Sequence, residues 1–158
     1  MRIWIDGDSC PRQVRDIVNA RCINEKIPLC YVANRELPLP DSEFISFVLS
    51  SPAADSADDY IAEHASEGDL IITRDIPLAA SLVESGRAVI NDRGTQFTKN
   101  NVRERLAQRD FMQMMREVGV GQDKGSSYGA KEVKDFASCF DRLLVQMLRE
   151  ERFKRASS

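Results

Sequence analysis

The sequence lacks several features that mark particular classes of protein. None of its apolar runs approaches the ~20 residues that a helix needs to cross a bilayer. The stretch at residues 2–6 is short and charged, unlike the apolar centre of a signal peptide. No internal repeat or low-complexity linker interrupts the 158 residues, a length typical of one domain. We therefore expect a single cytoplasmic domain at residues 1–150, followed by a basic tail at 151–158, with no membrane partner.

Familiar catalytic motifs are also missing. The four cysteines form no C-x-x-C pair, which argues against a zinc site or a redox pair. The single histidine, His64, falls in a predicted helix, and no G-x-S-x-G motif accompanies it, so we expect no Ser-His-Asp triad. The glycines at 119–129 do not match the phosphate-binding pattern G-x-x-x-x-G-K-[ST]. These absences direct attention to the carboxylates.

Charge is present in quantity but is unevenly distributed. Residues 1–98 hold 9 basic and 16 acidic residues, a net charge of −7. Residues 99–158 hold 13 basic and 9 acidic residues, a net charge of +4. This asymmetry suits an N-terminal half that binds metal and a C-terminal half that binds phosphates. Two ordinary solvated surfaces would give the same charge distribution.

The apolar pattern alternates between strands and helices over the first ninety residues. Helices are expected after Pro11 and at residues 57–66 and 76–85. Short apolar strands are expected at residues 2–6, 28–33, 44–49, 69–73 and 88–90. Such alternation predicts an α/β, Rossmann-like domain of three layers, with about five mainly parallel strands and helices on both faces.

The remainder is expected to be helical. One helix is predicted at residues 99–108 and another around 111–118, ahead of a glycine-rich loop at 119–129. A long final helix has an apolar stripe that indicates core packing, made of Val133, Phe136, Phe140, Leu143, Leu144 and Met147.

Aspartates gather where the strands are expected to end. Asp6 ends the first strand and Asp75 follows the fourth, while Asp58 and Asp59 begin the helix between them. Ligands of parallel α/β sheets bind outside the carboxyl ends of the strands. If the first and fourth strands are neighbours, we expect Asp6 and Asp75 to share one crevice that the helix start also reaches.

Gathered carboxylates either raise one another's pKa or hold a cation. Oxygen ligands favour Mg²⁺ or Mn²⁺, and two such ions would activate water at a phosphodiester. Helix capping explains Asp55, Asp58 and Asp59 equally well, because aspartate oxygens accept from free N–H groups at helix starts. Asp6 is harder to explain in that way, because it ends a strand.

The order of these segments resembles the YaiI/YqxD family of uncharacterised bacterial proteins. The resemblance covers nearly the whole chain. It rests on WIDGDSCP at 4–11, VAN at 32–34, DSADDYI at 55–61, GDLIITRDIPLA at 68–79, Arg93-Gly94, Phe97-Thr98, Asn101, RDFM at 109–112, Phe136-Ala137 and Asp141-Arg142. Arg74 stands where the family often has alanine, which predicts a cation beside Asp75.

That family is similar to the PIN-like domains, a superfamily of metal-dependent nucleases. The resemblance implies a PIN-like fold with acids after the first strand, on a middle helix and after the next strand, matched by Asp6, by Asp58 or Asp59, and by Asp75. A fourth acid often follows, where this chain has Pro77 and Leu78, so Asp8 or Asp92 would have to replace it.

We therefore expect a Mg²⁺- or Mn²⁺-dependent nuclease that acts on RNA. The expected catalytic residues are Asp6, Asp58, Asp59 and Asp75, and the expected metal ligands are Asp6, Asp8, Asp59 and Asp75. The expected substrate-binding residues are Ser9, Cys10, Asn34, Thr73, Arg93, Arg103 and Arg109, with Arg12 and Arg105 as further phosphate contacts.

Two other functions remain open. Asp6-Gly7-Asp8-Ser9 resembles the strand-end motif of haloacid-dehalogenase phosphotransferases, in which the first aspartate is the nucleophile. Alternatively, the same fold binds nucleic acid or a protein without catalysis, since fold alone does not fix function. Oligomeric state does not follow from the sequence. Cys10 and Ser9 are expected to line the pocket at the start of the first helix, without acting as nucleophiles.

Overall fold

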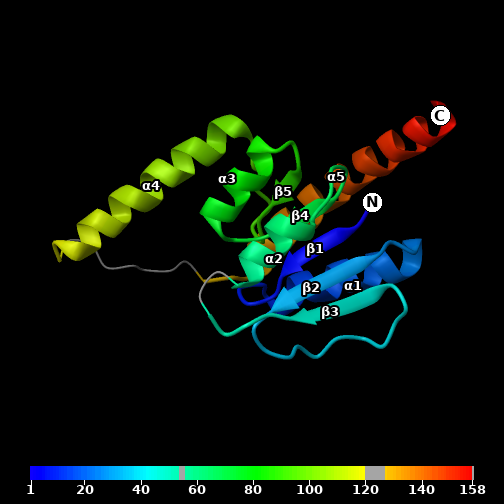
Figure 1. Ribbon diagram of the computed structural model, residues 1–158, viewed down its shortest axis with the longest axis horizontal. Coiled ribbons are helices and arrows are strands. Elements are labelled where there is room, and N and C mark those ends of the chain that lie inside the picture. Colours follow the sequence, from blue (N-terminus) through cyan, green and yellow to red (C-terminus); the bar gives the residue numbers. More distant parts are fainter. Residues whose placement is uncertain (54–55, 120–126, 158) are drawn as a thin grey trace.

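The computed structural model describes residues 1–53, 56–119 and 127–157 as one α/β domain (Figure 1). Its centre is a five-stranded parallel sheet of order β3-β2-β1-β4-β5. The strands are β1 (Ile3–Asp6), β2 (Leu29–Ala33), β3 (Ile45–Leu49), β4 (Leu70–Ile72) and β5 (Ala88–Ile90). The fold class predicted from the sequence is confirmed. The first strand is central and the fourth is its neighbour, which is the condition for bringing Asp6 and Asp75 to one edge.

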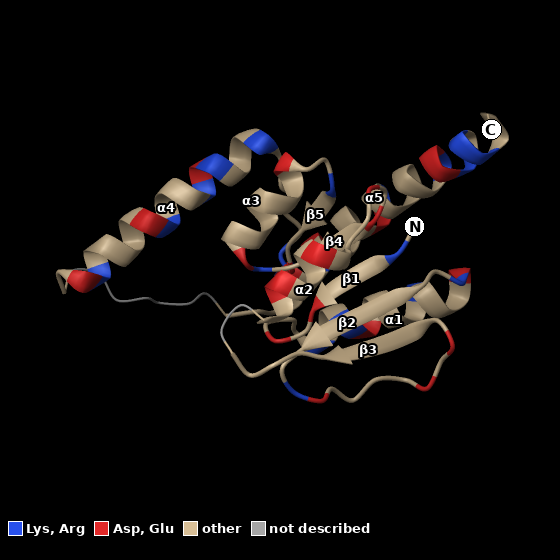
Figure 2. Cartoon of the chain, in the orientation of Figure 1, with Lys and Arg blue, Asp and Glu red and all other residues tan. Residues whose placement is uncertain are grey.

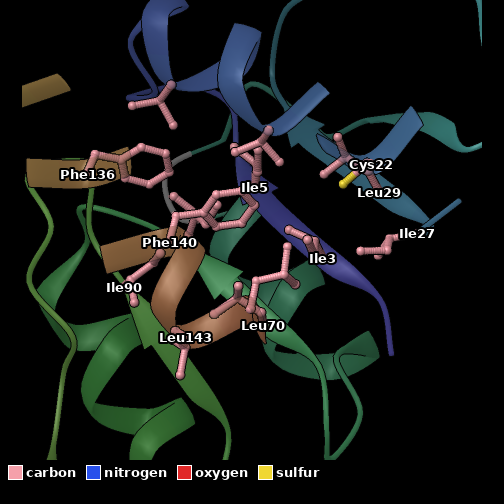
Figure 3. Close-up of a cluster of buried hydrophobic side chains, with 14 of the residues drawn as sticks. Ile3, Ile5, Cys22, Ile27, Leu29, Leu70, Ile90, Phe136, Phe140 and Leu143 are labelled. Carbon is pink, nitrogen blue, oxygen red and sulfur yellow. The ribbon is translucent and has the colours of Figure 1, made fainter. Parts of the chain in front are cut away.

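Alternation along β1 explains why helices cover both faces of the sheet. Ile3 and Ile5 face α1 (Arg12–Glu25) and α5 (Ala130–Ser157) in one buried cluster, part of which Figure 3 shows. Trp4 faces the opposite cluster, formed with α2 (Ser56–His64), α3 (Ile76–Glu84) and α4 (Lys99–Glu117). Successive side chains of a strand point to opposite faces, so one short strand supports both layers.

The two long helices differ from what the sequence pattern predicts. Residues 99–117 form one helix rather than two, because no glycine or proline interrupts the chain near Arg109 and Asp110. Thr98 and Asn101 form a capping box at its start. The final helix has the predicted buried stripe and continues through residue 157, so residues 151–157 are helical.

α4 extends away from the sheet as a separate arm (Figure 1). Val102 is its one buried residue, whereas Phe111, Met114 and Val118 near its end are exposed. No helix in the described part of the chain is long and apolar enough to cross a membrane. Asp55 and most of the glycine-rich stretch at 119–129 lie outside the described residues.

Candidate functional site at the carboxyl edge of the sheet

Asp6 lies at the carboxyl end of the central strand, between β2 and β4. Thr73, which follows β4, connects it to the next aspartate. The Thr73 hydroxyl donates to Asp6 Oδ2 at 3.3 Å and accepts from the backbone N–H of Asp75 at 3.1 Å. The parallel register of β1 and β4 therefore brings Asp6 and the Asp75 segment to one edge, as the sequence predicts.

The Asp6 carboxylate is buried with little compensation for its charge. It is 6% exposed and accepts two long hydrogen bonds, both of 3.3 Å, from Thr73 and from the backbone N–H of Asp8. Burial raises the pKa of Asp6, and the charges of Asp8 and Asp75 raise it further. None of the ion pairs between described residues includes Asp6.

The other acids of the edge are tied to the backbone in different ways. Asp8 is exposed, and its Oδ1 accepts from the backbone N–H of Asn34 at 2.9 Å, which joins the turn after β1 to the end of β2. Asp75 caps α3, since its Oδ1 accepts from Leu78 N at 2.8 Å. Asp58 and Asp59 occupy the first turn of α2.

Two depressions run along this edge, and Asp58 lines both. The smaller, of about 170 Å³, is lined by Asp6, Asp8, Asn34 and Asp58, together with Ser50 and Ser56. The larger, of about 300 Å³, is lined by Asp58, Asp59, Asp75 and Arg109. Acidic residues of α2 thus lie beside the end of β1, with basic residues recurring along α4 (Figure 2).

The four predicted metal ligands divide between these depressions. Asp6 and Asp8 line the smaller one, and Asp59 and Asp75 line the larger one, so Asp6 and Asp75 lie at one edge but do not share one depression as expected. Within the described residues, no group of three or more His, Cys, Asp or Glu side chains lies close enough together to hold a metal ion. A cation bound here would therefore take few protein ligands at once.

Arg74 does not neutralise Asp75. Its guanidinium pairs with Asp92, with Nε 3.1 Å from Asp92 Oδ2, and this hydrogen bond is the main cause of the raised pKa of Arg74. Asp92 is 4% exposed, and its backbone carbonyl accepts from the Tyr128 hydroxyl at 2.6 Å. The carboxylate of Asp92, one of the two possible replacements for a fourth acid, is thus already paired with an arginine.

Cys10 lies just before α1 and packs against the buried cluster on that side of the sheet. Burial raises the pKa of its thiol to about 12, so the group is protonated at neutral pH. Its Sγ lies 3.6 Å from the Pro11 carbonyl, to which it donates. Contrary to expectation, Ser9 and Cys10 line neither depression. The expectation that Cys10 is not a nucleophile stays a prediction.

The predicted substrate-binding arginines are spread over three places. Arg109 lines the larger depression. Arg103 pairs with Glu84 at 3.6 Å on the outside of α4. Arg93 lies over the ring of Tyr128 and 3.6 Å from Glu132. Of these three, Arg109 is the one placed beside the acids.

Sequence reasoning missed the serines that follow β3. Ser50, Ser51 and Pro52 line the smaller depression, and the buried Ser50 hydroxyl has no hydrogen-bond partner in the part of the chain that the structure describes. The sequence does indicate Ser50, because it directly follows the third predicted strand, and ligands of parallel sheets bind outside the carboxyl ends of strands.

Comparisons with known proteins agree on one family. A sequence model of the YaiI/YqxD family, described as uncharacterised, matches residues 4–146. A UPF0178 protein of Treponema denticola is 43% identical over 150 residues, which is 95% of this chain and 96% of that protein. One from Citrifermentans bemidjiense is 45% identical over 152 residues, or 96% of this chain and 99% of that protein. No solved structure matches.

Proposed function

This chain belongs to the YaiI/YqxD family, and we propose that the carboxyl edge of its sheet is a phosphodiesterase site that uses a divalent cation to hydrolyse RNA. The observation that carries the proposal is Asp6. It is a buried carboxylate with a raised pKa and weak hydrogen bonds, at the sheet edge where ligands of α/β folds bind. The resemblance of the family to PIN-like domains, which are metal-dependent nucleases, also favours hydrolysis of a phosphodiester.

The donor chemistry of the edge fits Mg²⁺ or Mn²⁺. All the candidate ligand atoms are carboxylate oxygens, and the repulsion that raises the pKa of Asp6 is the kind that a cation relieves. Mg²⁺ in phosphoryl-transfer sites commonly binds through one or two carboxylates, with substrate phosphate and water completing its shell. A site without three converging protein ligands is consistent with that arrangement.

In this proposal Asp6 holds the cation together with Asp58 or Asp75. A bound cation would polarise the phosphate and lower the pKa of a water molecule. Thr73 positions Asp6, because its hydroxyl donates to one carboxylate oxygen while accepting from the backbone beyond β4. Arg109 binds a neighbouring phosphate from its place in the larger depression.

In this proposal a row of arginines on one face of α4 contacts further phosphates of the nucleic acid. At 100° per residue, Arg105, Arg109 and Arg116 lie within about 40° of one another around the helix and span roughly 16 Å along it. This row passes the acidic depression at Arg109, and it is suited to the phosphates of a strand rather than to a small substrate.

The test is cleavage of labelled single-stranded and duplex RNA with Mn²⁺, Mg²⁺ or chelator. We expect cleavage that the chelator abolishes and that Asp6→Asn lowers by about a hundredfold or more, a loss typical of removing a group essential to charge stabilisation. Asp41→Asn, which changes an exposed loop aspartate, is the matched control and should cleave as the wild type does. Equal cleavage by the Asp6 and Asp41 variants would overturn the proposal.

Two outcomes would favour the alternatives. A covalent beryllofluoride adduct on Asp6 would indicate the phosphotransferase, although that reaction needs an ionised nucleophile and Asp6 has a raised pKa. Salt-sensitive RNA binding without cleavage under any metal would instead indicate a binding module.

A further inference from the structure

A separate cavity of about 480 Å³ lies on the α1 side of the sheet. It is lined by α1 and by the loop that precedes β3, and it shares no lining residue with the acidic depressions. Its lining residues are Arg12, Arg15, Asp16 and Asn19 of α1 and Pro38, Leu39 and Pro40 of the loop. This composition places charged donors opposite a wall that is largely apolar.

Arg15 is the unusual residue of this cavity. Its Nε and Nη1 atoms are buried and have no hydrogen-bond partner among the described residues, and no ion pair within that part of the chain includes it. A guanidinium stays charged at any physiological pH, and buried donors left unpaired are destabilising. Such an orphan in a native protein calls for a partner that the chain itself does not supply.

The neighbours of Arg15 add hydrogen-bond donors but no net charge. Arg12 lies 3.9 Å from Asp16, so it offsets the one acid of the lining and leaves Arg15 unbalanced. Asn19 accepts from the Tyr31 hydroxyl at 2.6 Å through its Oδ1, which leaves its amide nitrogen as the donor. Arg12 and Arg15 also lie in the first turn of α1, where the helix dipole favours an anion.

The loop side of the cavity limits the kind of ligand. Pro38 and Pro40 have no backbone N–H to offer, and Leu39 is packed against the core. A bound molecule would therefore be held by an anionic group at α1 while its remaining atoms lie against apolar side chains. The volume is within the range of small-molecule sites.

We propose that this cavity binds a small organic oxyanion, through a phosphate or carboxylate group that the Arg15 guanidinium holds. Arg15 lines the cavity, and the planar fork of arginine matches both groups with two parallel hydrogen bonds. The site is independent of the acidic edge, so a chelator and Asp6→Asn leave it unchanged.

The experiment is titration calorimetry of the full chain at low salt with three probes: inorganic phosphate, adenosine 5′-monophosphate and citrate. We expect binding at millimolar concentration or below by at least one probe. Tighter binding of phosphate and the nucleotide identifies a phosphate ligand, and tighter binding of citrate identifies a carboxylate ligand. No binding by any probe would overturn the proposal.

Variants assign the binding to the cavity. Arg15→Gln should weaken it by about tenfold or more, because a charge-assisted hydrogen bond is lost. Arg15→Lys, which keeps the charge without the fork, should weaken it less. Arg35→Gln is the matched control, since Arg35 is exposed on the neighbouring loop. Equal affinity in Arg15→Gln and Arg35→Gln would contradict the proposal. If Arg15→Gln does not fold, Arg15→Lys is compared with Arg35→Gln instead, and equal affinity in those two variants would contradict the proposal.

Discussion

Asp69 and Asp6 are buried to nearly the same degree, 7% and 6% exposed, at opposite ends of neighbouring strands. Asp69 precedes β4, and its carboxylate accepts three hydrogen bonds of 2.9 to 3.0 Å, from the backbone N–H groups of Arg2 and Ser66 and from the Trp4 indole. Asp6 ends β1 and accepts two of 3.3 Å. One carboxylate is satisfied by the fold, and the other is left with capacity for a ligand.

Asp92 adds a third case at the same edge as Asp6. It is buried as well, but Arg74 supplies a positive charge. Burial of a charge is tolerated where donors or a cation compensate for it. Asp92 Oδ1 accepts no hydrogen bond from the described residues, but Asp92 has its cation. Within that part of the chain, Asp6 has neither a cation nor a hydrogen bond shorter than 3.3 Å, and we propose that this difference separates a structural role from a functional one.

The largest expected effect is at Asp69. In Asp69→Asn, the amide has one oxygen for three donors and leaves some of them unsatisfied. We expect the free energy of unfolding to fall by about 3 kcal/mol and the melting temperature by roughly 6–12 °C. Urea and thermal unfolding measure this, with Asp41→Asn as the control. A loss below about 0.5 kcal/mol would remove the contrast between the two sheet edges.

The next effect concerns Arg74. Arg74→Ala leaves the Asp92 carboxylate buried without its cation, which should lower the free energy of unfolding by about 2 kcal/mol, less than for a fully buried pair because Arg74 is 51% exposed. Adding Asp92→Asn to the same chain should restore much of the loss. If the double variant is as unstable as Arg74→Ala, the charge of Asp92 is not the cause.

A smaller effect is expected at Asp75, which combines a structural and a proposed functional role. Its carboxylate caps α3, and asparagine caps helices about as well as aspartate does. Asp75→Ala should therefore lower the free energy of unfolding by about 1 kcal/mol, and Asp75→Asn by only a few tenths. Both should lower cleavage of RNA. Full activity in Asp75→Asn would limit this residue to capping.

The sequence predicts the sheet well because its strands are short apolar runs separated by helices or by a loop, and each run pairs with a parallel neighbour. The strand-end rule also places Asp6 and the Asp75 segment at one edge. It does not predict that Arg74 turns to Asp92, because that choice depends on how the ends of β4 and β5 are spaced. The donors of Asp69 and the unpaired nitrogens of Arg15 likewise depend on contacts between distant residues.

The single helix at Lys99–Glu117 illustrates another limit of sequence patterns. The apolar stripe formed by Phe111, Met114, Met115 and Val118 suggests a separate element, since it does not continue the face on which Val102 lies. At 100° per residue, Phe111 is on the side of α4 opposite Val102, which packs in the core. A change of apolar face along one helix, from the buried side of Val102 to the exposed side of Phe111, looks like two helices in the sequence.

The last prediction concerns the effect of pH on Asp6, where the smallest change in stability is expected. Because burial raises the folded-state pKa of Asp6, the folded protein binds a proton more tightly there than the unfolded chain does. Stability from this group is therefore greatest below the unfolded pKa, near 3.8, and declines as pH rises through the raised folded pKa. Above that pH the ionised Asp6 destabilises the fold, and a neutral asparagine avoids this cost.

We thus expect Asp6→Asn to be at least as stable as the wild type at neutral pH, with an advantage that shrinks as the pH falls toward 3.8. Urea unfolding of both proteins across this range measures the difference, and Asp69→Asn gives the opposite sign at neutral pH. Divalent cation added at neutral pH should narrow the gap, because it stabilises only the protein that keeps the carboxylate. If Asp6→Asn is instead clearly less stable than the wild type at neutral pH, Asp6 is a structural acid like Asp69, and its weak hydrogen bonds do not mark a site.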